Sequence, residues 1–88
     1  MADYEVLVPK QVGKRLEKLP RDVIERIYRR LRQLAQDPRP PWSKQLRGEP
    51  AGWRFRVGSY RVLYEIEDDE ERVVIRDVGH RRDIYRKG

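Results

Sequence analysis

One stretch of the sequence decides the fold: Trp53-Arg54-Phe55-Arg56-Val57-Gly58-Ser59-Tyr60-Arg61-Val62-Leu63-Tyr64. Apolar and charged residues alternate strictly over residues 53–57, which is typical of a half-buried β-strand. Gly58-Ser59 forms a two-residue loop with glycine at its first position, as a type II′ turn requires, and residues 60–66 read as the returning strand. The stretch therefore predicts a β-hairpin.

The two-residue loop also fixes the register of this hairpin. Val57 then lies opposite Tyr60, Arg56 lies opposite Arg61, and opposed residues share a face of the sheet. One face carries the large apolar side chains, which can receive a helical layer: Trp53, Phe55, Val57, Tyr60, Val62 and Tyr64. The other face carries Arg54, Arg56 and Arg61.

The three arginines have two interpretations. Like charges directly across a ladder destabilise it by about 0.2–1 kcal/mol, and an anion held between Arg56 and Arg61 would offset that cost. The alternative is that the arginine stems lie over an open sheet face and keep their charged ends in water. An anion-binding face and a solvated face are both open at this point.

The segment before the hairpin predicts one strand and two helices. Residues 4–8 read as a strand that Pro9 ends. Val12, Leu16 and Leu19 form the apolar stripe of a short helix, and residues 20–36 follow the 3.6-residue period of a longer one. The prolines of residues 37–41 stop the second helix, so the two helices form a hairpin.

The segment after the hairpin predicts a second turn and a last strand. Residues 65–71 hold six of the 15 acidic residues and no basic one, and form a hairpin tip. Residues 73–78 form the last strand, which Gly79 breaks before a basic tail. The fold class is α+β: a four-stranded sheet with the helices on one face and a short C-terminal helical tail, in a single domain over residues 1–88.

Composition narrows the classes of function. The 88 residues include no cysteine and one histidine, so we expect no disulfide, no metal and no cofactor. No apolar run approaches the roughly 20 residues of a membrane span, and the first residues do not resemble a signal peptide, so we expect a cytoplasmic protein. The formal net charge of +6 agrees with a partner that is a nucleic acid or an acidic protein, and equally with a solvated surface.

The basic tail and the loop before the hairpin add candidates for RNA or ribosome binding: Lys44, Arg47, Arg82, Arg86 and Lys87. Tyr85 can stack on a base or can pin the tail to the domain. The sequence has no P-loop, no G-x-G-x-x-G turn and no Ser/His/Asp set with a nucleophile turn. Three activities remain: binding nucleic acid, cleaving it without a metal, or docking an acidic protein.

Four segments, in this order and with these spacings, resemble the RelE/ParE superfamily of bacterial and archaeal toxins, on its RelE side. They are Lys44-Gln45-Leu46-Arg47-Gly48, Trp53-Arg54-Phe55-Arg56, Tyr60-Arg61-Val62-Leu63-Tyr64 and Val78-Gly79-His80-Arg81-Arg82-Asp83-Ile84-Tyr85. The resemblance implies a toxin of a toxin–antitoxin pair, a RelE-type mRNA interferase that cuts messenger RNA in the ribosomal A site. It also implies a RelB-like antitoxin partner.

The resemblance also places residues at the family's functional positions: Arg54, Arg56, Arg61, Arg81 and Tyr85. Arg61 and Arg81 suit the binding of phosphate, and Tyr85 suits stacking on a base. RelE-type toxins carry lysines at the positions of Arg54 and Arg56, one of them as general base, and arginine is a poor base at neutral pH. His80, Lys44 or Glu49 takes that role here, or positioning alone carries the rate.

Two further hypotheses use the same scaffold. One is a ParE-like toxin that inhibits gyrase, or a catalytically inactive homologue that acts as a binding module. The other is a basic RNA-binding protein without an antitoxin. The retained Arg61, Arg81 and Tyr85 favour the endoribonuclease.

Overall fold

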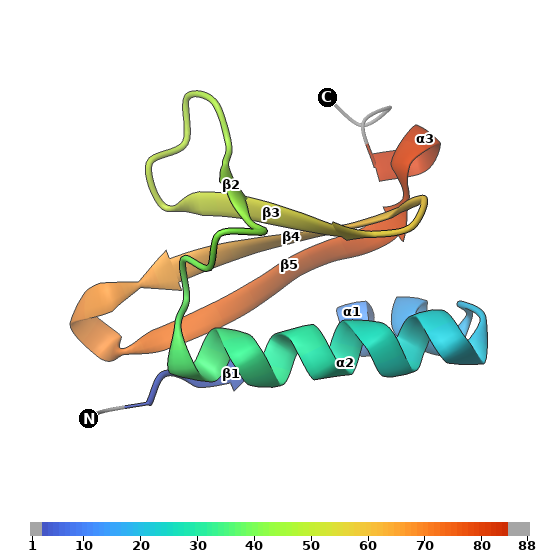
Figure 1. The fold of residues 1–88 in the computed structure, drawn as a ribbon, viewed down its shortest axis with the longest axis horizontal. Coiled ribbons are helices and arrows are strands. Elements are labelled where there is room, and N and C mark those ends of the chain that lie inside the picture. Colours follow the sequence, from blue (N-terminus) through green and yellow to red (C-terminus); the bar gives the residue numbers. More distant parts are fainter. Residues whose placement is uncertain (1–2, 85–88) are drawn as a thin grey trace.

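The computed structural model describes residues 3–84 and has two layers, a sheet with two helices on one face (Figure 1). Its elements, in chain order, are β1 (Glu5–Leu7), α1 (Lys10–Glu17), α2 (Arg21–Gln36), β2 (Lys44–Gln45), β3 (Gly52–Val57), β4 (Tyr60–Glu67), a 3₁₀ turn (Asp68–Glu70), β5 (Arg72–His80) and α3 (Arg81–Ile84). The α+β class is confirmed. No helix within residues 3–84 is long and apolar enough to cross a membrane.

The described residues form a mixed sheet of five strands in the order β1-β5-β4-β3-β2. β1 pairs with β5 in parallel, and the other neighbours are antiparallel. The predicted number of four strands is wrong, because β2 adds Lys44 and Gln45 to the edge of β3. A strand of two residues is too short for an alternating pattern to reveal it.

The register of the central hairpin is as predicted. Val57 pairs with Tyr60, and Arg56 pairs with Arg61. Gly58 has a φ of +59°, whereas Ser59 does not have a positive φ, which fits a type II′ turn. The turn therefore fixes which side chains face the helices.

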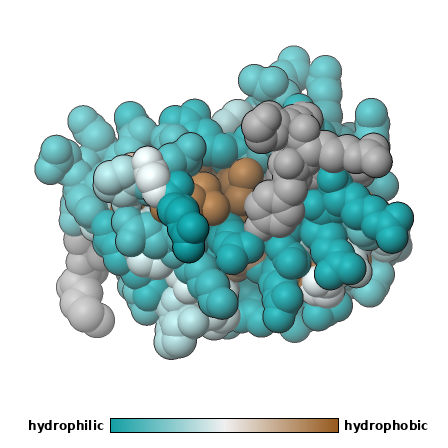
Figure 2. All heavy atoms as spheres, turned by 90° about the horizontal axis from the view of Figure 1, so that it is seen from above, coloured by the Kyte–Doolittle hydropathy of each residue, from teal (hydrophilic) through white to brown (hydrophobic). Residues whose placement is uncertain are grey.

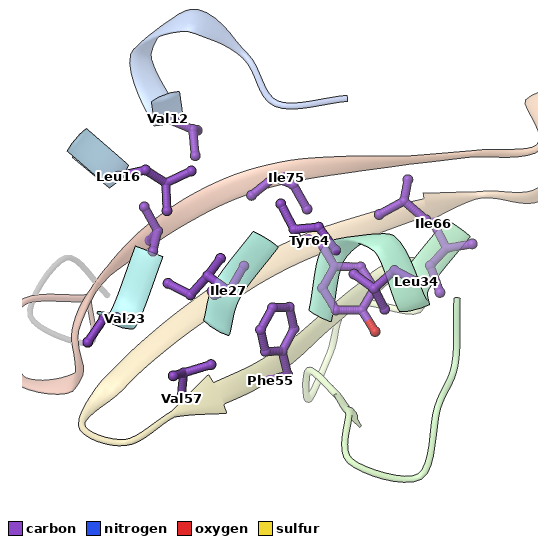
Figure 3. Close-up of a cluster of buried hydrophobic side chains, with 14 residues drawn as sticks. Val12, Leu16, Val23, Ile27, Leu34, Phe55, Val57, Tyr64, Ile66 and Ile75 are labelled. Atoms are coloured by element: carbon purple, nitrogen blue, oxygen red, sulfur yellow. The ribbon is translucent and has the colours of Figure 1, made fainter. Parts of the chain in front are cut away.

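The core lies between this hairpin, β5 and the two helices (Figure 3). α2 begins directly after Pro20 and buries one side chain per turn: Val23, Ile27, Leu31 and Leu34. Tyr64 is fully buried, and its hydroxyl donates a hydrogen bond to the Pro38 carbonyl oxygen at 2.9 Å. Burial raises the pKa of Tyr64 above its ordinary value. Trp53 and Tyr60 pack against this core but stay partly exposed.

The last strand differs from its prediction. β5 runs from Arg72 to His80, so Gly79 does not end it. Gly79 pairs with Arg61 and His80 pairs with Tyr60. The reason is that Gly79 does not have a positive φ, and an extended glycine continues a ladder like any other residue. The helical tail begins at Arg81.

The acidic segment forms the predicted hairpin tip, but half of its charge is compensated. Arg72 pairs with Glu67, and Arg76 pairs with Glu65. Arg39 reaches Asp68 from the loop after α2 at 2.7 Å, and the Tyr4 hydroxyl donates a hydrogen bond to the same carboxylate at 2.6 Å. The tip is thereby tied to the residue before β1 and to the loop after α2.

Candidate nucleic-acid site

A pocket of about 190 Å³ brings four basic side chains together beside two aromatic rings. Its lining residues are Trp42, Lys44, Arg54, Phe55, Arg56 and Arg61. In β2, Lys44 pairs with Arg54, and the pocket extends from this pair along β3 to Arg56. Figure 2 shows the face of the sheet opposite the helices, where hydrophilic side chains surround a small hydrophobic patch.

Strand pairing places like charges opposite each other at this site. Arg56 lies opposite Arg61 in β3 and β4, as predicted, and Lys44 lies opposite Arg54 in β2 and β3. Each such pair of like charges destabilises the sheet by about a few tenths of a kcal/mol, which is the lower end of the range for cross-strand pairs. A bound anion would remove that repulsion and would add charge-assisted hydrogen bonds.

Arg61 is the most buried of these cations, with 9% of its surface exposed. Its Nε and Nη1 atoms are buried and have no hydrogen-bond partner among the residues that the structure describes. A buried guanidinium without partners is unfavourable, because its charge and its N–H donors have lost water without replacement. Phosphate oxygens carry the opposite charge and match the donors of an arginine, so a phosphate in the pocket that Arg61 lines would offset part of this cost.

Trp42 forms the aromatic wall of the pocket, and the sequence did not identify it as a site residue. Its ring meets Phe55 edge to face, with centroids 5.2 Å apart. The Arg30 guanidinium of α2 lies 4.5 Å from the centroid of the Trp42 ring. Trp42 is therefore fixed by both layers of the fold. It follows a proline-rich loop with no periodic pattern, so no local signal could place it.

The start of the C-terminal helix is attached to the central hairpin. The Arg81 amide donates a hydrogen bond to the Ser59 carbonyl oxygen at 2.8 Å. The His80 ring meets Tyr60 edge to face at 5.6 Å, and its Nδ1 accepts a hydrogen bond from the Arg82 amide at 3.3 Å. His80 thus caps the first turn of α3 and holds it beside the end of β5.

The predicted site residues that the structure describes fall into three groups. Lys44, Arg54, Arg56 and Arg61 share the pocket. His80, Arg81 and Arg82 lie at the adjoining end of β5 and in α3, and do not line it. Arg47 and Glu49 line a separate hollow formed by residues 45–50. Tyr85, Arg86 and Lys87 lie outside the described residues. Among the side chains that the structure describes, no group of three His, Cys, Asp or Glu could hold a metal ion.

Several solved structures with a similar fold are toxins in complex with their antitoxins. The matched chain of the toxin–antitoxin complex RelBE2 from Mycobacterium tuberculosis is 31% identical to this chain. The TM-score is 0.76, and the match covers 89% of this chain and 98% of that chain. The archaeal RelE–RelB complex from Pyrococcus horikoshii is 28% identical, with a TM-score of 0.81 over 90% of this chain and 96% of that chain. The fold and the basic pocket therefore define a small toxin of the RelE type.

Sequence comparison gives the family. The toxin RelG of Mycobacterium tuberculosis is 53% identical over 45 residues, which span 50% of this chain and 52% of RelG, so the match covers about half of each. A family model described as "ParE toxin of type II toxin-antitoxin system, parDE" matches residues 6–85. The chain belongs to this family, within the RelE/ParE toxin superfamily.

Proposed function

We propose that this protein is a ribosome-dependent endoribonuclease that cleaves messenger RNA in the A site, and that a RelB-like antitoxin binds it in the cytoplasm. The observation that carries the proposal is the pocket in which Lys44 and three arginines converge, with Nε and Nη1 of the buried Arg61 unpaired among the described residues. The solved RelE–RelB complexes support the antitoxin as partner. Positive charge at this density suits an RNA phosphate.

The chemistry is attack by the ribose 2′-hydroxyl on the adjacent phosphorus. The new bond closes a 2′,3′-cyclic phosphate while the bond to the 5′-oxygen breaks. A base takes the proton of the 2′-hydroxyl, and an acid returns a proton to the departing 5′-oxygen. Negative charge grows on the phosphate oxygens in between, where the Arg61 guanidinium, with Arg56 beside it, would stabilise it.

We infer that Lys44 is the group that takes the proton of the 2′-hydroxyl. Of the three residues that the sequence left open for this role, Lys44 lines the pocket and the other two do not. His80 uses its Nδ1 to accept a hydrogen bond from the Arg82 amide. Glu49 lies in the separate hollow of residues 45–50. Arginine keeps its proton at neutral pH, so the other cations of the pocket do not suit the task.

The experiment that tests the proposal is the mapping of cleaved messenger ends on purified, programmed ribosomes. We expect Arg61→Ala to lower the cleavage rate by about 100-fold or more, since it removes a group that stabilises the transition state. Arg76→Gln is the matched control, because it removes one positive charge from an exposed ion pair with Glu65, outside the pocket. An intact messenger with the wild-type protein, at full helix content, would contradict the proposal.

A second candidate function rests on the family model, which describes ParE toxins. A ParE-like toxin inhibits gyrase and uses this fold as a binding module without cleaving RNA. A supercoiling assay separates the two: inhibition of gyrase by the wild-type protein, with no messenger cleavage on ribosomes, would favour this candidate.

A further inference from the structure

The helical layer carries the whole formal net charge of the protein. Residues 10–36, which include α1 and α2, hold nine of the 21 Lys and Arg residues and three of the 15 Asp and Glu residues. The rest of the chain holds twelve basic and twelve acidic residues and is formally neutral. The charge of +6 therefore belongs to the two helices under the sheet (Figure 1).

Most of these basic side chains are exposed and unpaired. They are Lys10 and Lys14 on α1, Lys18 directly after α1, and Arg21, Arg26, Arg29 and Arg32 on α2. Among the described side chains, no ion pair or side-chain hydrogen bond engages them, although α1 and α2 contain three acids. The remaining two are in use: Arg15 pairs with Asp77 and Arg30 lies over Trp42. We call the seven exposed residues the basic helix surface.

The spacing of the three lysines is unfavourable for the free protein. Lys10, Lys14 and Lys18 follow one another at intervals of four residues, which places them about 6 Å apart along one side of α1 and of the residue that ends it. Two like charges at this spacing destabilise a helix by about as much free energy as two opposite charges would stabilise it. An extended anion along the surface would turn this repulsion into attraction.

The surface has the composition of a nucleic-acid interface rather than of a protein interface. The centres of protein interfaces are apolar and aromatic, with few charges. Among the described residues, Tyr28 is the one large hydrophobic side chain that is exposed, at 38%. The apolar sides of α1 and α2 are already buried on the sheet, which also leaves no apolar face for a membrane surface. Interfaces with nucleic acids are polar and strongly positive.

We propose that the basic helix surface is a second RNA-binding site, which binds the phosphate backbone of double-helical RNA. None of its seven residues lines the arginine pocket, so the two sites can act on different strands. Its cations follow two helices whose apolar sides are buried against the sheet, and double-helical RNA is recognised through the regular shape of its backbone. The proposal rests on the proposed function in one respect: in that setting the double-helical RNA belongs to the ribosome.

The test is binding of a labelled RNA duplex of about 20 base pairs and arbitrary sequence, measured by fluorescence anisotropy against salt concentration. The variant is the triple change Arg26→Gln, Arg29→Gln and Arg32→Gln, which keeps good helix formers at exposed positions of α2. Loss of three phosphate contacts should lower the slope of log K against log salt by about 2 to 3. We expect the affinity at low salt to fall by about tenfold or more.

The matched control changes the same three residues to lysine. It keeps the charge, so we expect it to keep the slope and most of the affinity. Unchanged duplex affinity in the glutamine variant, with its helix content intact, would overturn the proposal. A glutamine variant that loses antitoxin binding but still binds the duplex would also overturn it, because the surface would then be a protein-binding site.

The same proteins distinguish failure of this proposal from failure of the proposed function. A wild-type protein that binds the duplex through these arginines but cleaves no messenger on ribosomes would refute the nuclease and leave the surface standing. A protein that cleaves the messenger, with no effect of the glutamine variant on duplex binding or on binding to ribosomes, would refute the surface alone.

Discussion

At the scale of single residues, Lys44 is the lysine among three arginines in the pocket, and this difference can be tested. If it takes the proton of the 2′-hydroxyl, Lys44→Arg keeps the charge but removes the base, because arginine does not deprotonate in proteins. We expect this variant to bind RNA normally and to cleave about 100-fold more slowly or worse in single-turnover assays on ribosomes.

His80→Ala and Glu49→Ala are the controls for this prediction, since neither residue lines the pocket. Both should lower the cleavage rate by less than the arginine variant does. Full activity of Lys44→Arg would mean that Lys44 supplies only charge, and that another group takes the proton.

Tyr64 gives a prediction about stability at alkaline pH. Burial raises its pKa in the folded state, so the folded protein holds this proton more tightly than the unfolded chain does. The stabilisation is complete below the unfolded pKa of about 10 and is lost as the pH rises through the folded value. In Tyr64→Phe this alkaline loss should disappear.

Urea denaturation at pH 8 and pH 11 checks this result. At pH 8 the variant should be less stable by about 1 kcal/mol, because the Pro38 carbonyl oxygen loses its hydrogen bond. Tyr28→Phe, on the exposed side of α2, is the control. A wild-type alkaline profile in Tyr64→Phe would show that another group causes the loss.

At the scale of secondary structure, two glycines near the pocket should respond differently to alanine. Gly58 has a φ of +59°, where a side chain is strained, so Gly58→Ala should lower the free energy of unfolding by about 1–2 kcal/mol. Gly79 is extended, and a Cβ there meets no atom within 4 Å, so Gly79→Ala should be neutral or should stabilise by up to about 1 kcal/mol. Chemical denaturation of the two variants gives both values, and an equal loss in both would contradict the conformational argument.

The sequence predicts those elements in which local chemistry and pattern agree. Gly58-Ser59 determined the hairpin register, and the 3.6-residue period determined α2, because each signal is contained within the element. β2 was missed since its two residues pair with β3 through tertiary contact alone. The role of Gly79 was misjudged because a glycine in sequence does not reveal its φ.

In the pocket, too, the sequence predicts what local chemistry determines and misses what tertiary contacts determine. Arg56 and Arg61 could be placed opposite each other because the turn between them fixes their pairing. The approach of Lys44 to Arg54 and the position of Trp42 depend on how a loop without periodicity folds back over the sheet. The burial of Arg61, with Nε and Nη1 unpaired, is a property of the packed molecule and has no counterpart in the sequence.

At the scale of the whole molecule, charge is divided among three regions. The pocket gathers cations at one edge of the sheet, the helices carry the net charge, and the acidic tip is partly neutralised by Arg39, Arg72 and Arg76. Arg39 contributes more than a charge, since its guanidinium also lies 5.7 Å from the centroid of the Trp53 ring. Arg39 therefore connects the loop after α2 with the β3–β4 hairpin and with the acidic tip, and its contact with Asp68 helps to hold these three segments together.

Asp68 therefore gives a prediction about the stability of the whole fold in acid. Hydrogen bonds from Arg39 and Tyr4 lower the pKa of Asp68 below its ordinary value of 3.8. The resulting stabilisation is complete above pH 3.8 and is lost as the pH falls through the lower value in the folded protein. Asp68→Asn should thus be less stable than the wild type at pH 7, and the difference between the two should shrink at pH 2.5.

Urea midpoints at the two pH values measure that difference. Asp69→Asn is the matched control, because the neighbouring carboxylate has no ion pair among the described residues. It should lie close to the wild type at pH 7. An Asp68→Asn protein with the wild-type midpoint at pH 7 would show that the contact with Arg39 and Tyr4 does not hold the acidic tip to the rest of the molecule, and that the strand pairing of β4 with β5 does so alone.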